Sequence, residues 1–331
     1  MTSLKLEGPV NMLVILGLTL PEISPADVER IREAAPAGST VRVVNGMREG
    51  IAVAESADII FGYIPEPLFQ AAPRLCWVHA IASGMDMFLY PAMKDSDVIL
   101  TGEKGLVGGH LADTGFGLLL ALTRQIATAL RKGAAGWGER EAMRKVEVEL
   151  EGLTMGIIGF GGTGRAMARR AVAFGMQVCA VDAWPTAPSD GVGEVWALDQ
   201  FEALLGMSDV VAVCCPLSPE TRRLLDDRAF SAIKRGAIVV NVTRGEIIDG
   251  DALVRALEDG RCGGAALDVA PQEPLPPEHP LWGFANVVMT PHTAGASQLR
   301  GPRNIARFCD NLRRAGTGEP LVGVVDKELG Y

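Results

Sequence analysis

The chain has 331 residues, of which 48% are hydrophobic and 21% charged, a composition typical of a globular protein large enough for two domains. Its formal net charge is −9, and it has no basic block or basic stripe with interleaved aromatic residues, so we expect no nucleic-acid partner. The six cysteines show no C-x-x-C spacing, which favours buried free thiols in a reducing cytoplasm over disulfides or a metal site.

Two apolar stretches resemble membrane segments only superficially. Residues 10–20 contain Asn11 and lack a small-residue cleavage site, so they fit a first core strand better than a signal peptide. Residues 111–130 include Asp113 and Arg124, which a spanning helix would avoid. The sequence therefore predicts a protein without a membrane partner.

The first hundred residues alternate between strand-like and helix-like segments. A strand is expected at 11–17, followed by a helix that Ser24 caps, that begins at Pro25 and that ends before Pro36. Short buried strands are then expected at 40–44, 56–64, 75–81 and 97–101, with helical or loop material between them. This alternation predicts a parallel sheet.

The alternation continues after a long helix expected from His110 to Lys132 and a break at 133–138. Helices are expected at 165–174, 198–206, 227–236, 250–260 and 300–314, and strands at 155–159, 177–182, 209–216, 237–243, 263–269 and 286–292. Six parallel strands with helices between them predict a doubly wound α/β sheet.

A glycine cluster lies at the start of this second half. Gly159, Gly161 and Gly164 match G-x-G-x-x-G, follow an apolar strand and open a helix, which is the context that gives the motif its meaning. The first glycine permits a tight turn, the second lets the backbone approach a pyrophosphate, and the third lets the helix pack closely on the strand. The helix N-terminus then offers N–H groups to the phosphates, so the sequence predicts a dinucleotide site.

The next strand ends in Asp182, which predicts the kind of dinucleotide. A carboxylate at this place accepts hydrogen bonds from the adenosine ribose and repels a 2′-phosphate. Residues 183–186 contain no arginine to neutralise such a phosphate. We therefore expect NAD in preference to NADP.

Polar residues follow other strands of the expected sheet, where ligands of open α/β sheets bind. Arg244 is either an anion clamp or a solvated loop residue, and its place at this edge favours the clamp. His292 ends the last strand; a lone histidine is more often structural, but Glu273 could lie beside it and raise its pKa. The other histidines are weaker candidates: His79 in an apolar strand, His110 before the long helix and His279 in a proline-rich loop.

Several segments together resemble the D-isomer-specific 2-hydroxyacid dehydrogenase family, from about Leu75 to the C-terminus. Residues 82–88 resemble the substrate loop of this family, and residues 110–124 resemble its interdomain helix. Further matching segments are GIIGFGGTG (156–164), CCPLSPETRRLL (214–225), NVTRGEIIDGDAL (241–253), ALDVAPQEPLP (266–276), HPLWGFANVVMTPHTAG (279–295) and GEPLVGVVDKELGY (318–331). The combination is far more specific than any one motif.

The resemblance implies a catalytic trio. Arg244 would bind the carboxylate of a 2-oxo acid and polarise its 2-oxo group. His292 would donate a proton to that oxygen as NADH delivers hydride to the carbon, and Glu273 would orient His292 and keep it charged. Backbone N–H groups of Ser83 and Gly84 would complete the carboxylate site.

The resemblance also implies the cofactor contacts. Asp268 would lie near the nicotinamide amide, and Thr243 would contact the cofactor through its backbone. The expected cofactor-binding residues are Gly159, Gly161, Gly162, Thr163, Gly164, Asp182, Pro216, Thr243, Asp268 and Gly295, and no metal ion is expected. Gly162 and Thr163 stand where the family often has an arginine and a branched residue, a tolerable change because backbone groups hold the phosphates.

The fold implied is a Rossmann cofactor domain, residues 107–298, inserted into a flavodoxin-like substrate domain, residues 1–106 and 299–331. The cleft between the two would close on substrate. Family members are typically dimers joined through the cofactor domain, and Trp137 lies where an aromatic residue of some relatives reaches the partner's active site.

The substrate is less clearly indicated. Glyoxylate, hydroxypyruvate or another small polar 2-oxo acid is favoured, with residues 61–69 lining the pocket. Trp282 either forms a wall near His292 or packs in the core, and core packing is favoured. Arg300 and Arg303 either read a second anionic group or are solvated helix charges. A phosphite-oxidising relative carries a lysine where this chain has Ser83, which argues against that reaction. A non-catalytic NAD-sensing scaffold of the same fold is the alternative function.

Overall fold

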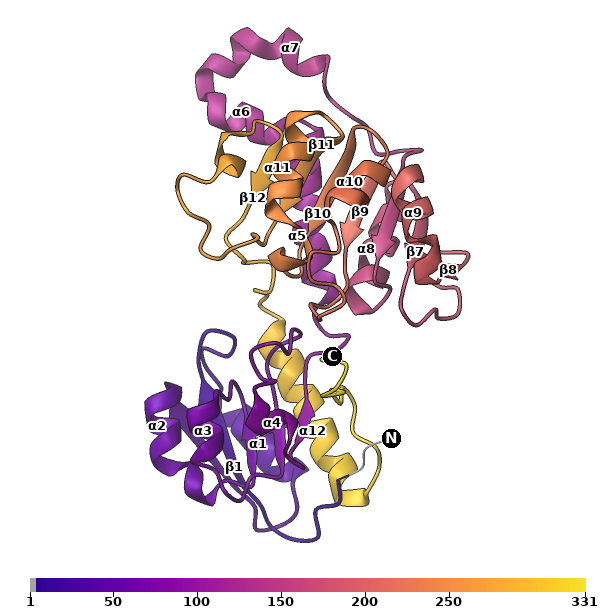
Figure 1. The fold of residues 1–331 in the computed structure, drawn as a ribbon. Helices are drawn as coiled ribbons and strands as arrows, with labels where there is room; N and C mark the ends of the chain where they lie inside the picture. Colours follow the sequence, from indigo (N-terminus) through magenta and orange to yellow (C-terminus); the bar gives the residue numbers. More distant parts are fainter. Residues whose placement is uncertain (1–3) are drawn as a thin grey trace. The chain divides into compact units, whose positions relative to one another are not determined.

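The computed structural model describes residues 4–331 and divides the chain into two compact units (Figure 1). Unit 1 combines Met1–Val107 with Ala296–Tyr331, and unit 2 comprises Gly108–Gly295. The chain therefore leaves unit 1 once and returns to it once. No helix in the described part of the chain is long and apolar enough to cross a bilayer.

Unit 1 is built on a five-stranded parallel sheet of order β2-β1-β3-β4-β5, the flavodoxin-like order. Its strands are β1 (Asn11–Leu16), β2 (Thr40–Asn45), β3 (Ile59–Phe61), β4 (Trp77–His79) and β5 (Ile99–Thr101). Its helices are α1 (Pro25–Ala34), α2 (Gly46–Val53), η1 (Ala54–Ser56), α3 (Glu66–Gln70), α4 (Pro91–Lys94) and α12 (Arg300–Thr317).

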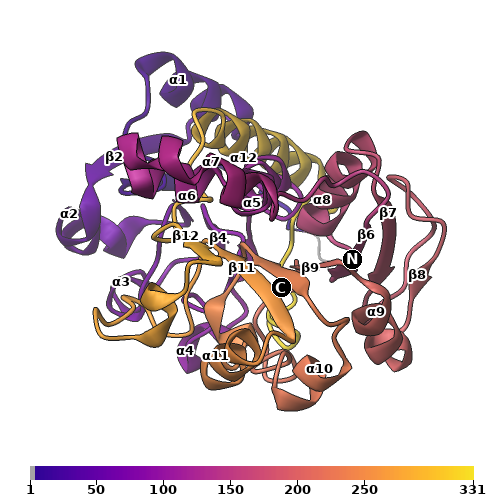
Figure 2. The ribbon, with the colours of Figure 1, turned by 90° about the horizontal axis from the view of Figure 1, so that it is seen from above.

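The two faces of this sheet are covered by different helices. α1 and the C-terminal α12 lie side by side (Figure 2), and Ile31 and Phe308 from them pack with Trp77 of β4 in one apolar cluster. Leu68 of α3 and Met93 of α4 belong to the cluster on the other face. Ser24 caps α1 as expected, since its side chain accepts a hydrogen bond from the N–H of Asp27.

Unit 2 is built on a seven-stranded parallel sheet of order β12-β11-β10-β9-β6-β7-β8, a Rossmann-type arrangement. Its strands are β6 (Thr154–Ile158), β7 (Gln177–Val181), β8 (Val195–Trp196), β9 (Val210–Val213), β10 (Ala237–Asn241), β11 (Cys262–Leu267) and β12 (Val287–Met289). Its helices are α5 (Gly108–Thr123), α6 (Ile126–Lys132), η2 (Gly133–Glu139), α7 (Arg140–Arg144), α8 (Gly162–Ala173), η3 (Leu198–Gln200), α9 (Phe201–Met207), α10 (Asp227–Ala232), η4 (Gly245–Ile247), α11 (Gly250–Glu258) and η5 (Pro280–Gly283).

The faces of this sheet also carry separate apolar clusters. Phe116 of α5 and Met167 of α8 belong to one cluster, and Phe230 of α10 and Leu253 of α11 belong to the other. The order reverses between β6 and β9, since β6 pairs with β7 on one side and with β9 on the other. Such a reversal is the place where doubly wound sheets bind ligands.

One expectation about unit 2 is wrong. The helix expected from His110 to Lys132 breaks at Gln125, which adopts a left-handed conformation with φ 55°. The expected break after Lys132 is confirmed, since α6 ends there at Gly133, which has φ 53°; the residues that follow form the helical turn η2, which leads into α7. Residues 126–144 form an arm of short helices, drawn at the top of Figure 1.

Candidate active site

Three neighbouring strands bring the expected catalytic residues to one edge of the sheet in unit 2. Asn241 at the end of β10 pairs in register with Leu267 at the end of β11, and Leu267 pairs with Met289 at the end of β12. The loops that leave these strand ends carry Arg244, Glu273 and His292, respectively. The strand register therefore sets where each of the three loops begins.

His292 and Glu273 form a direct pair. Nδ1 of His292 lies 2.7 Å from Oε2 of Glu273, and Oε1 of Glu273 accepts a hydrogen bond of 3.0 Å from the N–H of Ala270. Both side chains are partly open to solvent, with exposed fractions of 43% and 38%. Nδ1 is thus occupied by the carboxylate, and the other ring nitrogen is left as the one that can serve a ligand.

The backbone of His292 is strained. Its φ is 53°, in the left-handed region that residues other than glycine adopt rarely. Such strain persists only where surrounding contacts hold it, and it is concentrated at functional sites.

Asp268 supplies those contacts. Its buried side chain accepts hydrogen bonds from the hydroxyl of Thr290 at 2.6 Å and from the N–H groups of Thr293 and Ala294 at 2.9 and 2.8 Å. Its carbonyl oxygen accepts a fourth from the N–H of His292 at 2.7 Å. Sequence reasoning placed Asp268 beside the cofactor; in the structure it also fixes the turn that presents His292.

Arg244 is held by a residue that sequence reasoning missed. The fully buried Asn241 accepts hydrogen bonds from the N–H and hydroxyl of Thr243, and its amide donates to the carbonyl of Arg244 at 2.8 Å. Nη1 of Arg244 donates to the carbonyl of Thr243 at 2.9 Å. Next along the chain, a Cβ added to Gly245 would lie 1.7 Å from the carbonyl oxygen of Ala270, so this loop packs directly on the Glu273 loop.

The glycine cluster has the geometry of a nucleotide loop. Gly159 has φ +91°, and a Cβ there would lie 2.6 Å from the backbone of Cys215. A Cβ at Gly164 would lie 2.1 Å from the carbonyl oxygen of Gly159, so the first turn of α8 rests on the end of β6. At Gly161, by contrast, an added Cβ would meet no protein atom within 4 Å. The loop therefore fits a pyrophosphate, because it is tight where the protein packs and open where a ligand would approach.

Asp182 lies beside this loop. Its carboxylate accepts hydrogen bonds from the N–H of Phe160 at 2.6 Å and from the N–H of Trp184 at 2.8 Å. Sequence reasoning found no arginine among residues 183–186, yet the structure brings Arg165 of α8 to the same loop. There Arg165 donates to the hydroxyl of Thr186 at 2.8 Å and approaches Asp190 at 3.5 Å. The argument from a missing arginine is weaker than the sequence alone indicated.

The remaining expected contacts lie in several places. Ser83 and Gly84 follow β4 in unit 1, and Ser83 is exposed. The carbonyl of Pro216 accepts a hydrogen bond from Thr221 at 2.7 Å. Gly162 opens α8, and its carbonyl oxygen would lie 2.3 Å from a Cβ added to Gly108. Thr163 is the next residue of α8, and Gly295 is the last residue of unit 2.

Other polar residues singled out from the sequence are structural. His79 is fully buried, with Nδ1 2.8 Å from the hydroxyl of Thr101; burial, reinforced by the charge of Arg307, lowers its pKa to about 3. Nδ1 of His279 accepts a hydrogen bond from the N–H of Leu281. Within residues 4–331 no group of three or more metal-ligating side chains is close enough to hold a metal ion.

Two expectations about side chains outside the trio are wrong. Trp282 is 55% exposed rather than packed in the core, and its indole N–H donates to the carbonyl of Pro276. Arg300 is not a solvated helix charge, because it forms a two-pronged ion pair with Glu103 and its side chain is only 16% exposed.

The seven-stranded sheet, the glycine loop at its point of reversal and the carboxylate after β7 define a Rossmann-type dinucleotide-binding protein. Comparison with known proteins makes the assignment specific. Residues 116–294 match the family model described as "D-isomer specific 2-hydroxyacid dehydrogenase, NAD binding domain". The chain belongs to the D-isomer specific 2-hydroxyacid dehydrogenase family.

Individual relatives agree with this assignment. The chain is 33% identical to a glyoxylate reductase of Korarchaeum cryptofilum, over 83% of this chain and 84% of that protein. It is 34% identical to an (S)-sulfolactate dehydrogenase of Chromohalobacter salexigens, over 76% and 81%. Among solved structures it resembles a D-isomer specific 2-hydroxyacid dehydrogenase of Xanthobacter autotrophicus, in complex with NADPH and MES, with 28% identity, a TM-score of 0.79 and coverage of 97% and 100%.

Proposed function

We propose that the protein is an NADH-dependent reductase that converts a small 2-oxo acid to the D-2-hydroxy acid, reversibly. The observation that carries the proposal is the His292–Glu273 pair, which shares one sheet edge with Arg244 and the nucleotide loop. Relatives named glyoxylate reductase and glycerate dehydrogenase support a small substrate such as glyoxylate or hydroxypyruvate.

Each member of the trio has a distinct role in this proposal. Arg244 grips the carboxylate of the substrate through its planar guanidinium and polarises the 2-oxo group. His292 carries protons on both ring nitrogens before reduction: Nδ1–H donates to Glu273, and Nε2 gives its proton to the 2-oxo oxygen. The bound cofactor supplies the hydride that reaches C2. In the oxidative direction Nε2 takes the proton back.

NAD is the cofactor we propose, and Asp182 is the reason. Two backbone N–H groups fix its carboxylate at the end of β7, where it would accept hydrogen bonds from the hydroxyl groups of the adenosine ribose. Arg165 is engaged with Thr186 and Asp190 rather than presented alone to a phosphate. Because the structure of one relative contains NADPH, the preference for NAD over NADP should be measured directly.

Unit 1 is proposed as the substrate domain. The N–H groups of Ser83 and Gly84 would bind the substrate carboxylate, the same group that Arg244 is proposed to bind.

Turnover is the experiment that separates this proposal from its alternative. Purified protein is incubated with NADH and a panel of 2-oxo acids graded by size and charge, and NADH loss is followed by absorbance. Reduction of one or a few acids supports the enzyme and ranks the pocket. Bound NADH without reduction of any acid would instead favour the NAD-sensing scaffold.

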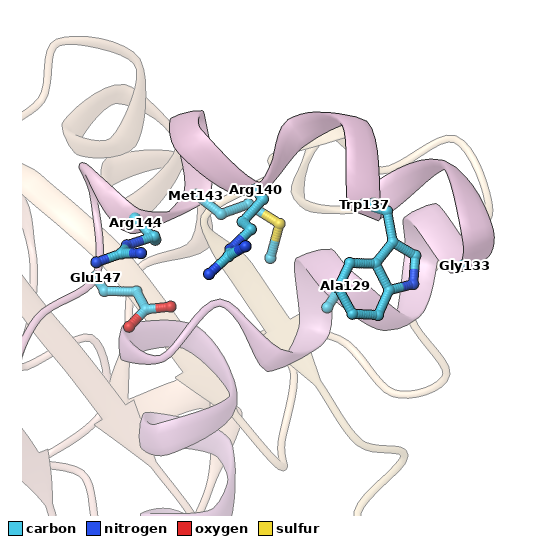
Figure 3. Close-up of a pocket in the computed structure, with 8 residues that line it drawn as sticks. Ala129, Gly133, Trp137, Arg140, Met143, Arg144 and Glu147 are labelled. Atoms are coloured by element: carbon cyan, nitrogen blue, oxygen red, sulfur yellow. The ribbon is translucent and has the colours of Figure 1, made fainter.

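We also propose a homodimer joined through unit 2. The arm of residues 126–144 has no buried residue, and its Trp137 is 82% and its Leu130 77% exposed. A hollow of about 360 Å³ lies beneath Trp137, Arg140 and Met143 (Figure 3), which a second copy of the arm could fill. Light scattering of Trp137→Ser should report a smaller mass than the unmodified protein. Trp184→Ser, a change at another exposed tryptophan, should leave the mass unchanged.

A cytoplasmic location completes the proposal. All six cysteines are free, and five of them are buried. Free thiols suit a reducing compartment. Cell fractionation with a C-terminal epitope would test the location directly.

A further inference from the structure

A buried ion pair in unit 1 joins two segments that are far apart in the sequence. Nε of Arg300 donates to Oε1 of Glu103 at 2.7 Å, and Nη2 donates to Oε2 at 2.6 Å. The side chain of Glu103 is completely buried. Asn304, one turn further along α12 and also completely buried, donates a third hydrogen bond to Oε1 at 2.6 Å. The carboxylate is therefore held from three directions.

This network is attached to the segment before Ser83. Nη2 of Arg300 donates to the carbonyl of Ile81 at 3.2 Å, and the N–H of Glu103 donates to the carbonyl of Ala82 at 3.0 Å. Two successive carbonyl groups are thus anchored by the two members of the ion pair. The neighbouring Gly102 packs closely against this segment, because a Cβ there would lie 3.0 Å from the carbonyl oxygen of Ala82.

The anchoring fixes where the following N–H group points. A peptide unit is planar and trans, so its C=O and N–H point in opposite directions. Because the carbonyl of Ala82 points to Glu103, the N–H of Ser83 in the same peptide unit points away from the network. Ser83 itself is exposed, so a ligand can approach this part of the segment.

Stability alone is a weak reason for such a pair. Burying a carboxylate and a guanidinium costs desolvation energy that their attraction often only offsets, and apolar residues can fill the same space as well. What an ion pair adds is a fixed direction for each of its hydrogen bonds.

We propose that Glu103, Arg300 and Asn304 are positioning residues that hold the 81–84 segment, so that the N–H groups of Ser83 and Gly84 grip the substrate carboxylate. The inference rests on the proposed reduction of a 2-oxo acid. It replaces a direct contact of Arg300 with the substrate by an indirect role, since Nε and Nη2 of its guanidinium both donate to Glu103. Every 2-oxo acid shares the carboxylate, so the network serves all substrates alike.

Two variants test this role, and a third is the matched control. Glu103→Gln removes the charge but keeps the shape, and Arg300→Lys keeps the charge but cannot reach Glu103 and Ile81 together. Arg313→Lys is the control, because Arg313 lies on the same helix and is exposed. Steady-state kinetics with several 2-oxo acids and NADH titrations are measured for all of them.

Either network variant should raise KM for every 2-oxo acid about tenfold, the effect of one lost hydrogen bond to a charged group. The turnover number should stay within about threefold of the unmodified protein, because uniform binding is lost rather than transition-state binding. NADH affinity and the kinetics of Arg313→Lys should not change. A rise in KM confined to substrates with a second anionic group would overturn the inference and make Arg300 a direct substrate contact. So would unchanged KM values in variants that are merely less heat-stable.

Hydrogen–deuterium exchange provides a readout that needs no turnover. The amides of residues 81–88 should exchange at least about tenfold faster in Glu103→Gln and Arg300→Lys than in Arg313→Lys. Unchanged exchange would show that the network does not order the segment, whatever the enzyme does. If the unmodified protein reduces no 2-oxo acid, the proposed function fails, and the exchange rates still decide whether the network positions the segment.

Discussion

Gly164→Ala separates two opposing effects at the nucleotide loop. An alanine inside a helix is favoured over glycine by about 1 kcal/mol. At this position, however, the new Cβ would lie 2.1 Å from the carbonyl oxygen of Gly159, and even a close C···O contact needs about 3.3 Å. The first turn of α8 must therefore move away from β6 by roughly 1 Å. Such overpacking costs about 2–3 kcal/mol, so we expect a net loss of about 1–2 kcal/mol in the free energy of unfolding.

Gly161→Ala is the matched control in the same loop. Gly161 has φ −78°, which any residue adopts, and its Cβ would meet no protein atom. Alanine is a poorer N-cap than glycine, so the loss of stability should stay below about 1 kcal/mol. NADH binding should nevertheless weaken at least about tenfold, because the methyl group occupies the space through which the pyrophosphate approaches.

Urea unfolding followed by circular dichroism and NADH titration by fluorescence measure both variants. A Gly164→Ala protein that is more stable than the unmodified one would refute the packing argument. A Gly161→Ala protein with unchanged NADH affinity would refute the assignment of the loop to the pyrophosphate.

Three further predictions concern single residues. His292→Ala should abolish reduction while NADH titration shows nearly unchanged binding; lost binding would mean that His292 is structural. Asp182→Ala should raise the Kd for NADH and reduce the preference for NADH over NADPH. An unmodified protein that already prefers NADPH would contradict the role of Asp182. The folded-state pKa of His79, about 3, lies below its ordinary 6.5. The stability it contributes is therefore complete above pH 6.5 and falls by up to about 1.4 kcal/mol per pH unit towards pH 3. Urea unfolding across this range should show that slope reduced in His79→Gln, and an identical slope would contradict the reasoning.

The parallel strands were predictable because each is an unbroken run of buried residues between polar or glycine-rich segments. The expected strand 237–243, for example, contains β10, which spans Ala237–Asn241. β8 was missed, since its two residues are too short to show a period. The break at Gln125 was missed as well, because a non-glycine residue takes the left-handed conformation there and gives no composition signal.

The polar residues at the strand ends were predictable, but most of the residues that hold them in place were not. That Glu273 could lie beside His292 followed from both being placed at the ends of neighbouring strands, and the structure gives their distance as 2.7 Å. Nothing in the sequence pointed to Asn241, which lies inside the expected strand 237–243. The contact of Glu103 with Arg300 spans 197 positions, a separation at which single-sequence patterns carry no information. The catalytic roles themselves remain predictions.

The measurement that tests the central claim most directly is isotope transfer. The protein is incubated with hydroxypyruvate and NADH deuterated at both C4 positions, and the glycerate formed is analysed by mass spectrometry and chiral chromatography. We predict one deuterium at C2 and the D-isomer as the sole product. Glycerate without the label, or the L-isomer, would contradict direct hydride transfer within the site built around Arg244, Glu273 and His292.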